Sequence, residues 1–359
     1  MSDTNRAVNL VLSGGGIKGV AFVGAYEELE RRYRTFGNIA GVSAGALIGA
    51  LIGAGYTAKE LIKILKEFDF SILKLRSGDY LDISLNGRIR KLLEEKRILT
   101  DSDFESLLYR QDYPELQKLR RGREDFRGTR GNFLSNLIAF SQQNAFLDGN
   151  LLERWVAQLL ANKGVYTFGD LRKGMPDKVN PRGYKVRMTA IDANIGRVIV
   201  LPDDVALYNM NPDNFEVAKA VRMSACVPFV FEPCVLTKKE NNHLKQHYII
   251  DGGVLDNFPV WLLDSTQLGN IIGLKLEGKE SKDITNAENM LKKLLVTSHD
   301  TGVPKNSYNI DNIAHINTGN ISFLDFDISQ EDMQFLYQQG KLAVQKLFIN
   351  MHKRSRGWN

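Results

Sequence analysis

The sequence predicts an α/β protein built as a three-layer α/β/α sandwich around a mainly parallel central sheet. Strand-like apolar runs alternate with segments of helical spacing, which is the pattern of a sheet covered by helices on both faces. The 359 residues are 43% hydrophobic and suffice for one sizeable core, and no linker rich in Pro, Gly or Ser divides them. We expect a single domain over 1–359, with a core at about 5–275. A helical, partly basic insertion is expected at about 71–146, and a helical extension that is regulatory or faces a membrane over 276–359.

The first predicted strand is Ala7–Leu12, and helical spacing follows over Val20–Glu30. A glycine cluster separates the two segments, and its backbone N–H groups can converge on one point at the start of the helix. Such a nest binds negative charge. Its residues are Gly14, Gly15, Gly16 and Gly19. Lys18 lies in the same turn, where it either adds to the positive field or is a solvated charge.

The second junction between a strand and a helix carries a serine. Gly37–Val42 predicts a short buried strand, and Ala44–Ala54 predicts an apolar helix of small residues that packs closely under a sheet. Ser43 lies between them, and its neighbours Gly41 and Gly45 permit the cramped turn that exposes a serine Oγ. We therefore predict that Ser43 is a nucleophile. A glycine nest that faced it would bind the oxyanion of an acyl-transfer transition state.

The glycine spacing also fits a dinucleotide-binding loop, G-x-G-x-x-G after a strand, through Gly14, Gly16 and Gly19. That interpretation requires an acidic residue about 20 positions further on, at the end of the second strand, to hold the ribose hydroxyls. The predicted strand ends in Gly41–Ser43, which contains no carboxylate. The sequence thus disfavours an oxidoreductase, and we expect no cofactor.

A nucleophilic serine needs a base, which is usually a histidine oriented by a carboxylate. In the chain order of α/β-hydrolases, the triad would comprise Ser43, Asp251 and either His299 or His315. The surroundings of both histidines are typical of surface or strand-end residues. Moreover, only about 40 residues precede Ser43, whereas the turn that carries the nucleophilic serine of an α/β-hydrolase follows several strands. The sequence therefore disfavours both histidines as the base.

Asp251 is the better candidate for the base. It ends the apolar run Tyr248–Ile250 and is followed by Gly252 and Gly253. An aspartate at a strand end places a carboxylate at the carboxyl edge of a sheet, where open α/β sheets gather their ligands, and the glycines leave room for another backbone. An ordinary Asx-turn has the same local sequence, so the pattern alone leaves both interpretations open.

The remaining elements follow from the same periodicities. A capping box at Thr57–Glu60 begins a helix whose apolar stripe ends at Phe68. A final helix is predicted over Glu331–Met351, followed by a basic tail that either frays or docks on a membrane through Trp358. We assign the apolar side of this helix to Phe335, Leu336, Leu342, Val344, Leu347 and Phe348. Further strands are predicted at Tyr184–Ile191, Val198–Leu201 and Ile271–Leu276.

Three motifs together resemble the patatin-like phospholipase family. They are Gly14–Gly19, Gly41–Gly45 and Asp251–Gly253, in the order and approximate spacing of that family. Ala220–Pro233 is similar to the segment that precedes the family's aspartate strand, and the resemblance covers roughly residues 5–275. Further similar pieces in the middle of the chain are Leu147–Gly149, Trp155 and Tyr166–Leu171.

The resemblance implies a patatin-like fold and a lipid acyl hydrolase of the phospholipase A or lysophospholipase type. It implies a histidine-free Ser-Asp dyad in which Ser43 is the nucleophile, Asp251 is the base and an acyl-enzyme forms. The oxyanion hole would consist of Gly14, Gly15, Gly16 and Gly19. Supporting roles fall to Lys18, Gly41, Gly45, Gly252 and Gly253. The alternative is a patatin-fold regulatory or effector protein that stays latent until a partner or second messenger binds.

Charge bears on the partners. The formal net charge of +5 and a pI near 9.0 favour an anionic surface. The basic segment 118–130 is either a solvated loop or a lid that meets phosphate headgroups, and no nucleic-acid-binding framework surrounds it. We expect an acyl lipid as substrate, an anionic membrane surface, and a protein or small-molecule activator. We expect no nucleic acid as a partner.

Targeting signals and cysteines bear on the compartment. The sequence shows neither a secretory h-region near its start nor about 18 successive apolar residues. Its two cysteines, Cys226 and Cys234, suggest neither a disulfide framework nor a metal cluster. We expect a cytoplasmic protein that associates peripherally with membranes, and secretion without a signal peptide is also compatible with the sequence.

Overall fold

The computed structural model describes residues 7–70, 73, 149–228, 230–240, 243–264, 268–278 and 312–356. The expected insertion at about 71–146, apart from Leu73, and the basic segment 118–130 within it lie outside the described residues. His299 and Trp358 do as well. The division of the chain into core, insertion and extension therefore stays a prediction.

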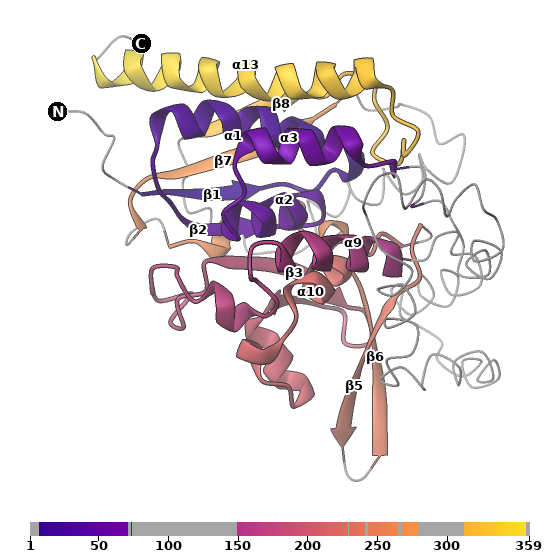
Figure 1. Cartoon of the computed structure of the whole chain (residues 1–359). Helices are drawn as coiled ribbons and strands as arrows, with labels where there is room; N and C mark the ends of the chain where they lie inside the picture. Colours follow the sequence, from indigo (N-terminus) through magenta and orange to yellow (C-terminus); the bar gives the residue numbers. More distant parts are fainter. Residues whose placement is uncertain are drawn as a thin grey trace.

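One sheet of eight strands forms the middle layer of the described residues (Figure 1). Its order is β5-β6-β3-β2-β1-β7-β8, and β4 pairs with β3 beside this path. The strands are β1 (Val8–Leu12), β2 (Phe36–Gly41), β3 (Val186–Asp192), β4 (Arg197–Leu201), β5 (Cys234–Glu240), β6 (His243–Asp251), β7 (Ile271–Glu277) and β8 (Ile313–Asn317). From β3 through β2, β1 and β7 to β8 the strands are parallel, whereas β4, β5 and β6 pair antiparallel. The predicted α/β sandwich with a mainly parallel sheet is confirmed.

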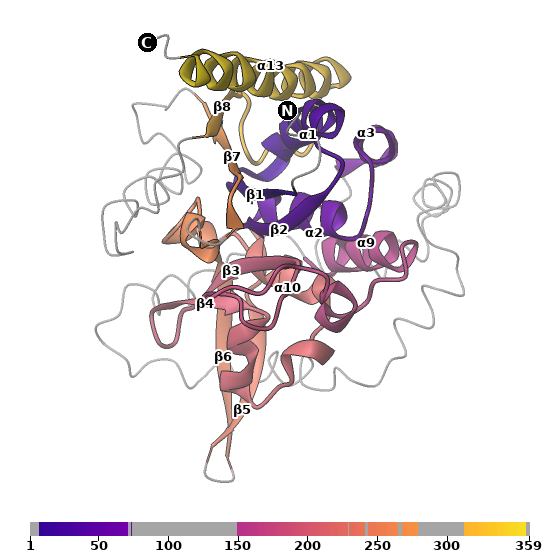
Figure 2. The same ribbon diagram turned by 90° about the vertical axis from the view of Figure 1, so that its left-hand side faces the viewer.

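Helices pack along the sheet (Figures 1 and 2). They are α1 (Val20–Arg32), α2 (Ala44–Gly53), α3 (Ala58–Glu67), α9 (Asn150–Ala161), α10 (Val217–Ser224) and α13 (Gln330–Ser355). The 3₁₀ helices are η2 (Gly16–Gly19), η5 (Phe168–Leu171), η6 (Asp203–Tyr208), η7 (Pro212–Asn214), η8 (Gly252–Val254) and η9 (Val260–Leu262). The predicted capping box begins α3, with Thr57 and Glu60 bonded reciprocally. Among the described residues, no helix combines the length and the apolar character that a membrane crossing requires.

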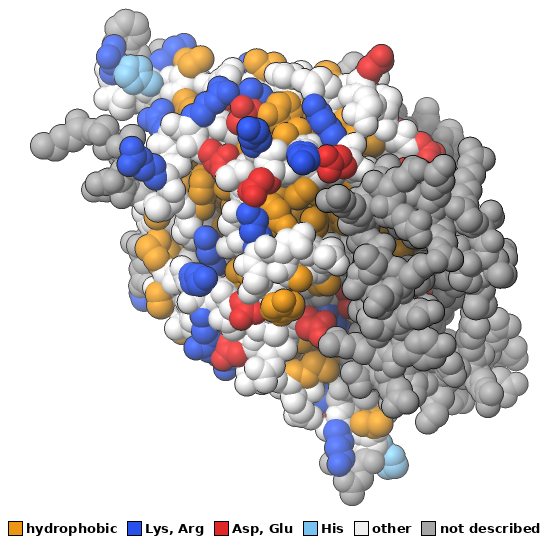
Figure 3. All heavy atoms as spheres, viewed as in Figure 1, with side chains coloured by type: hydrophobic (Ala, Val, Ile, Leu, Met, Phe, Trp, Pro, Cys, Tyr) orange, Lys and Arg blue, Asp and Glu red, His pale blue; other side chains and the backbone are white. Residues whose placement is uncertain are grey.

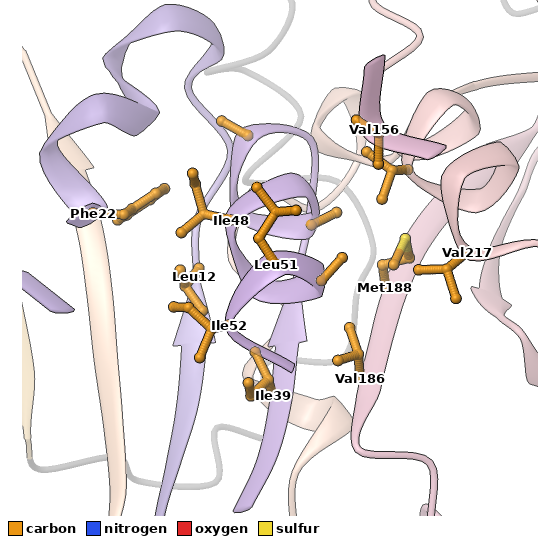
Figure 4. Close-up of a cluster of buried hydrophobic side chains, with 14 of the residues drawn as sticks. Leu12, Phe22, Ile39, Ile48, Leu51, Ile52, Val156, Val186, Met188 and Val217 are labelled. Atoms are coloured by element: carbon orange, nitrogen blue, oxygen red, sulfur yellow. The ribbon is translucent and has the colours of Figure 1, made fainter. Parts of the chain in front are cut away.

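Both faces of the central strands are buried, which explains why β1 is an uninterrupted apolar run. Leu10 and Leu12 pack into the larger core with α1 and α2, and Figure 4 shows part of this core around α2. Val11 points to the opposite face, where it packs with Leu262 and Leu263. Successive side chains of β1 thus pack alternately into the apolar layers on the two faces of the sheet.

α13 lies at the periphery of the described residues, against α1 and β8 (Figure 2). Two glycines allow the helices to approach closely. A Cβ atom on Gly24 would collide with the carbonyl oxygen of Tyr337, and one on Gly340 would collide with that of Ala21. The backbones of α1 and α13 are therefore in direct contact where they cross.

The predicted C-terminal helix is confirmed, but the side assigned to its apolar residues is partly wrong. Leu336, Val344 and Leu347 are buried as expected. Phe335 and Leu342 are instead exposed at 39% and 44% of their surface, because they project from the side of α13 that faces away from α1.

Candidate active site

Ser43 lies in a sharp turn between β2 and α2, as the sequence predicts. Its backbone has φ +55° and ψ −121°, a conformation that residues with side chains rarely adopt. The flanking glycines give the turn its space. A Cβ atom on Gly41 would lie 2.5 Å from the carbonyl oxygen of Gly45, and one on Gly45 would collide with the backbone of Leu12. The strained turn therefore depends on both glycines.

Ser224, the last residue of α10, holds this turn from outside. The backbone N–H of Ser43 donates to Oγ of Ser224 at 2.9 Å, and the Ser224 hydroxyl donates to the carbonyl oxygen of Thr189 in β3 at 2.7 Å. Ser224 is fully buried, so water does not replace these bonds. Nothing in the local sequence distinguishes this serine from others at helix ends. Its place in the segment Ala220–Pro233 is the one signal that pointed toward it.

Asp251 reaches the same edge of the sheet from the opposite direction. β6 is antiparallel to β3 and ends where Asp251 lies opposite Ala190. The aspartate thus lies near the carboxyl ends of the parallel strands. It does so because β6, which runs antiparallel to them, ends at this residue. Its backbone N–H donates to the carbonyl oxygen of Cys226 at 2.8 Å, and its Oδ1 accepts the N–H of Gly253 at 2.7 Å.

The side chains of Ser43 and Asp251 lie within hydrogen-bonding reach of each other. Asp251 is 3% exposed, and this burial raises the pKa of its carboxyl group to about 7. Hydrogen bonds from Ser43 and from the N–H of Gly253 lower the pKa, but by less than burial raises it. A carboxyl group with a pKa near neutrality can both accept and return a proton at physiological pH.

The glycine loop faces the serine. A Cβ atom on Gly14 would lie 3.3 Å from Cβ of Ser43. The N–H of Gly14 is occupied, because it donates to the carbonyl oxygen of Asn257 at 3.2 Å. The N–H groups of Gly15 and Gly16 donate to no acceptor among the described residues. Of these two glycines, Gly16 also lines the cavity beside Ser43.

Two of the other predicted site glycines allow close packing around the site, and Lys18 lies outside the cavity lining. A Cβ atom on Gly19 would lie 2.9 Å from Cβ of Ala44, so this glycine lets η2 approach α2. A Cβ atom on Gly252 would lie 2.6 Å from the carbonyl oxygen of Thr189, so this glycine brings the Asp251 turn against β3. Lys18 is half-buried and is not among the residues that line the cavity beside Ser43.

An apolar cavity opens beside Ser43. The glycine loop and Ser43 form its polar end, and no charged side chain is among the described residues that line it. Phe323, in the segment before α13, lines the cavity and also accepts the N–H of Ile17 at its carbonyl oxygen, at 3.1 Å. The cavity therefore receives part of its wall from the last described segment of the chain. Other lining side chains include Leu47, Leu65, Leu152, Phe231, Leu324 and Phe326.

Trp155 of α9 forms an aromatic wall of this cavity. It stacks on Phe68 with ring centroids 4.0 Å apart, and Phe68 meets Phe70 edge-on at 5.0 Å. Trp155 and Phe70 both line the cavity. Stacked aromatic rings make a large and rigid apolar surface.

No described histidine lines the cavity beside Ser43. His315 projects from β8 and is exposed. His247 is buried on β6, with its Nδ1 2.6 Å from an oxygen of Asp192. Neither lines the cavity beside Ser43. Of the two histidines considered for a triad, the structure thus does not bring His315 to Ser43, and His299 lies outside the described residues.

The two cysteines of the chain are free thiols. Cys226 is buried, and its carbonyl oxygen accepts the backbone N–H of Asp251, whereas Cys234 is the first residue of β5. Within the described ranges, no group of three or more His, Cys, Asp and Glu side chains is arranged to hold a metal ion.

Comparison with known families agrees with this geometry. A family model described as patatin-like phospholipase matches residues 10–264, more than half of the chain. The chain belongs to the patatin-like phospholipase family. The matched region contains the glycine loop, the Ser43 turn and Asp251, and it ends before β7. Membership of this family implies hydrolysis of lipid esters.

Individual relatives extend the match. The uncharacterized protein YqhO of Bacillus subtilis (strain 168) is 34% identical over 341 residues, which are 94% of this chain and 94% of YqhO. The uncharacterized protein R571 of Acanthamoeba polyphaga mimivirus is 43% identical over 68 residues, 18% of this chain and 23% of R571. Among solved structures, VipD from Legionella pneumophila matches with a TM-score of 0.51 and 17% identity, covering 96% of this chain and 67% of the VipD chain. The likeness to VipD concerns the fold alone.

Proposed function

We propose that this patatin-like protein is a lipid acyl hydrolase of the phospholipase A or lysophospholipase type, with Ser43 as nucleophile and Asp251 as base. One observation carries the proposal. A buried carboxyl group with a pKa of about 7 lies within hydrogen-bonding reach of a serine in a strained turn. The apolar cavity opens at the same serine, and Gly16, whose N–H has no acceptor among the described residues, also lines it.

In the first step, the carboxylate of Asp251 accepts the hydroxyl proton of Ser43 while Oγ attacks the carbonyl carbon of the ester. Negative charge moves to the carbonyl oxygen, which accepts hydrogen bonds from the N–H groups of Gly15 and Gly16. Collapse of this intermediate breaks the bond to the alcohol, and protonated Asp251 gives its proton to the leaving alkoxide. The fatty acyl group remains on Ser43 as an ester.

In the second step, water takes the place of the serine hydroxyl. Ionised Asp251 accepts a proton from a water molecule whose oxygen attacks the acyl carbonyl carbon. Collapse breaks the bond to Oγ of Ser43, and the proton passes from Asp251 to that oxygen. The fatty acid leaves and the starting state returns. One carboxyl group thus carries the proton in both steps.

The lining of the cavity supports a fatty acyl group as the part of the substrate bound there. Burying each methylene group contributes about 0.8 kcal/mol. A polar or charged acyl group would leave its hydrogen-bonding groups without partners against Leu47, Trp155 and Phe231. Long aliphatic esters therefore bind this site better than short ones.

Two nearly isosteric variants test the dyad. Ser43→Ala and Asp251→Asn should each lower kcat about 1000-fold or more, on p-nitrophenyl esters and on phospholipid in mixed micelles. Ser355→Ala and Asp327→Asn make the same chemical changes at exposed positions and should retain full activity. An alkyl fluorophosphonate should add one adduct, on Ser43, which peptide mass spectrometry locates. Wild-type activity in either dyad variant would overturn the proposal.

A further inference from the structure

α13 carries a second apolar face. Phe335, Leu342 and Ile349 are exposed at 39%, 44% and 56% of their surface. Because they follow one another at intervals of seven residues, or two helical turns, they form one line along the helix. We call these three residues the outer stripe. A line of exposed apolar side chains on a helix that is already packed on its other side marks an interaction surface.

Leu342 and Ile349 of the outer stripe point away from α1, whereas the ring of Phe335 also lies close to Gly319, in the segment after β8. α13 meets α1 at Gly340, and Leu342 follows two residues later, about 200° around the helix axis from that contact. The buried residues of α13 gather on the side toward α1 and β8. They are Met333, Leu336, Gly340, Ala343, Val344 and Leu347. Leu342 and Ile349 are therefore free of the core that holds the helix in place.

The charges beside Leu342 and Ile349 are basic, whereas the exposed Glu331 lies one helical turn before Phe335. Residues 333–356 contain no Asp or Glu. Lys346, Lys353 and Arg356 are exposed, and none of them pairs with an acid of the described chain. Lys341 turns inward instead, where its Nζ lies 3.0 Å from a glutamate of α1. Figure 3 shows basic and hydrophobic side chains together along the edge of the molecule that α13 forms.

A second helix does not fit this face. Two helices that pack along their length need apolar residues at two positions of every heptad. The outer stripe supplies one such position, and the residues three places further on are Gln338, Gln345 and His352. A lipid surface makes no such demand, because a single line of apolar side chains can enter it between flanking cations.

We propose that the outer face of α13 docks the protein on an anionic lipid surface. The outer stripe enters the boundary between the headgroups and the acyl chains, and the three basic residues lie at the level of the lipid phosphates. This contact uses neither Ser43 nor the cavity. It is therefore independent of the proposed chemistry and is tested separately from it.

Co-sedimentation with vesicles tests the docking surface. The parent protein is Ser43→Ala, so that no lipid is consumed during the measurement. We expect it to bind vesicles of phosphatidylcholine mixed with phosphatidylglycerol, to bind less as salt increases, and to bind pure phosphatidylcholine weakly. Leu342→Ser combined with Ile349→Ser should lower the partition coefficient at least about tenfold. Lys346→Glu combined with Lys353→Glu should lower it about 25-fold or more, since each cation near an anionic surface contributes about fivefold.

The matched control is Ile195→Ser combined with Leu207→Ser. These side chains are exposed at 48% and 39% outside α13, and their replacement should leave vesicle binding unchanged. Equal binding by the outer-stripe and control variants overturns the proposal, as does a parent protein that ignores anionic vesicles. A dimer in size-exclusion chromatography that the outer-stripe variant abolishes would assign the face to a second copy and also overturn it. With Ser43 restored, the stripe variant should hydrolyse a short soluble ester at the wild-type rate, which keeps the docking result separate from the chemistry.

Discussion

The hydroxyl group of Ser224 accepts the backbone N–H of Ser43 at 2.9 Å and donates to the carbonyl oxygen of Thr189 at 2.7 Å. One buried oxygen atom thus connects α10, the strained turn and β3. A non-glycine residue with φ +55° persists only where its surroundings hold it. We infer that Ser224 is a positioning residue for the nucleophile.

Ser224→Ala should reduce kcat by about 10-fold to 100-fold on a soluble ester while KM changes little. The variant leaves the Ser43 N–H buried without an acceptor, which costs about 1–3 kcal/mol and lets the turn relax. Steady-state kinetics and urea unfolding measure the two effects. Ser224→Cys keeps a weak acceptor and should recover part of kcat.

Ser329→Ala serves as the control for the Ser224 prediction. Ser329 caps α13 by accepting the N–H of Asp332 at 3.0 Å and does not line the cavity, so its loss costs about 1 kcal/mol of stability without removing a contact at the site. It should leave kcat unchanged. If both serine variants lose activity in proportion to stability, Ser224 has a structural role only.

The pKa of Asp251 predicts the pH profile of hydrolysis. The base works only when ionised, and burial raises its pKa to about 7. The value of kcat/KM should therefore rise with pH and level off above about pH 7, measured with a neutral ester that does not itself titrate. A profile that is flat between about pH 5 and pH 9 would contradict Asp251 as the base.

The same shift makes stability depend on pH. Because the pKa of Asp251 is higher in the folded state than in the unfolded state, its stabilising contribution is full below about pH 4 and is lost as pH rises through 7. Asp251→Asn stays neutral throughout. It should raise the free energy of unfolding by an amount on the order of 4 kcal/mol at pH 8, and by almost nothing at pH 4. Urea unfolding at the two pH values checks this, and an equal gain at both would refute it.

Leu47 offers a way to narrow the cavity without touching the dyad. Leu47→Trp places a larger ring among the lining residues and should shorten the acyl chain that fits. For an ester of about 16 carbons, kcat/KM should fall at least tenfold relative to an ester of about four carbons, because each excluded methylene forfeits about 0.8 kcal/mol. Leu207→Trp, at an exposed position of η6, is the control. A uniform loss across chain lengths would show that the cavity does not hold the acyl chain.

The sequence predicts the positions of Ser43 and Asp251 because each motif meets a local requirement. A cramped turn needs small neighbours, and a strand end that another backbone approaches needs glycines. Ser224 meets no local requirement of this kind. It contacts the Ser43 amide across 181 residues of chain, so only the tertiary structure reveals the bond.

The buried side of α13 and the direction of β6 also cannot be predicted from the local sequence. The apolar residues of α13 lie on two sides of the helix, and periodicity alone does not say which side meets α1. The sequence therefore assigns Phe335 and Leu342 to the buried side, although both are exposed. Strand-forming residues likewise suit parallel and antiparallel pairing. The direction of β6, which brings Asp251 to the site, depends on its pairing with β3 and is absent from the sequence of the strand.

Phe323 lies beyond residue 264, where the family match ends, yet it holds Ile17 of the glycine loop and lines the cavity. A protein shortened to the matched region would keep its serine, its aspartate and every loop glycine. It would lose the acceptor that fixes the loop and one wall of the cavity. In this chain, therefore, the family motifs alone do not make a complete site. A homologue truncated before this segment would keep those motifs but would lack part of the cavity wall beside the serine.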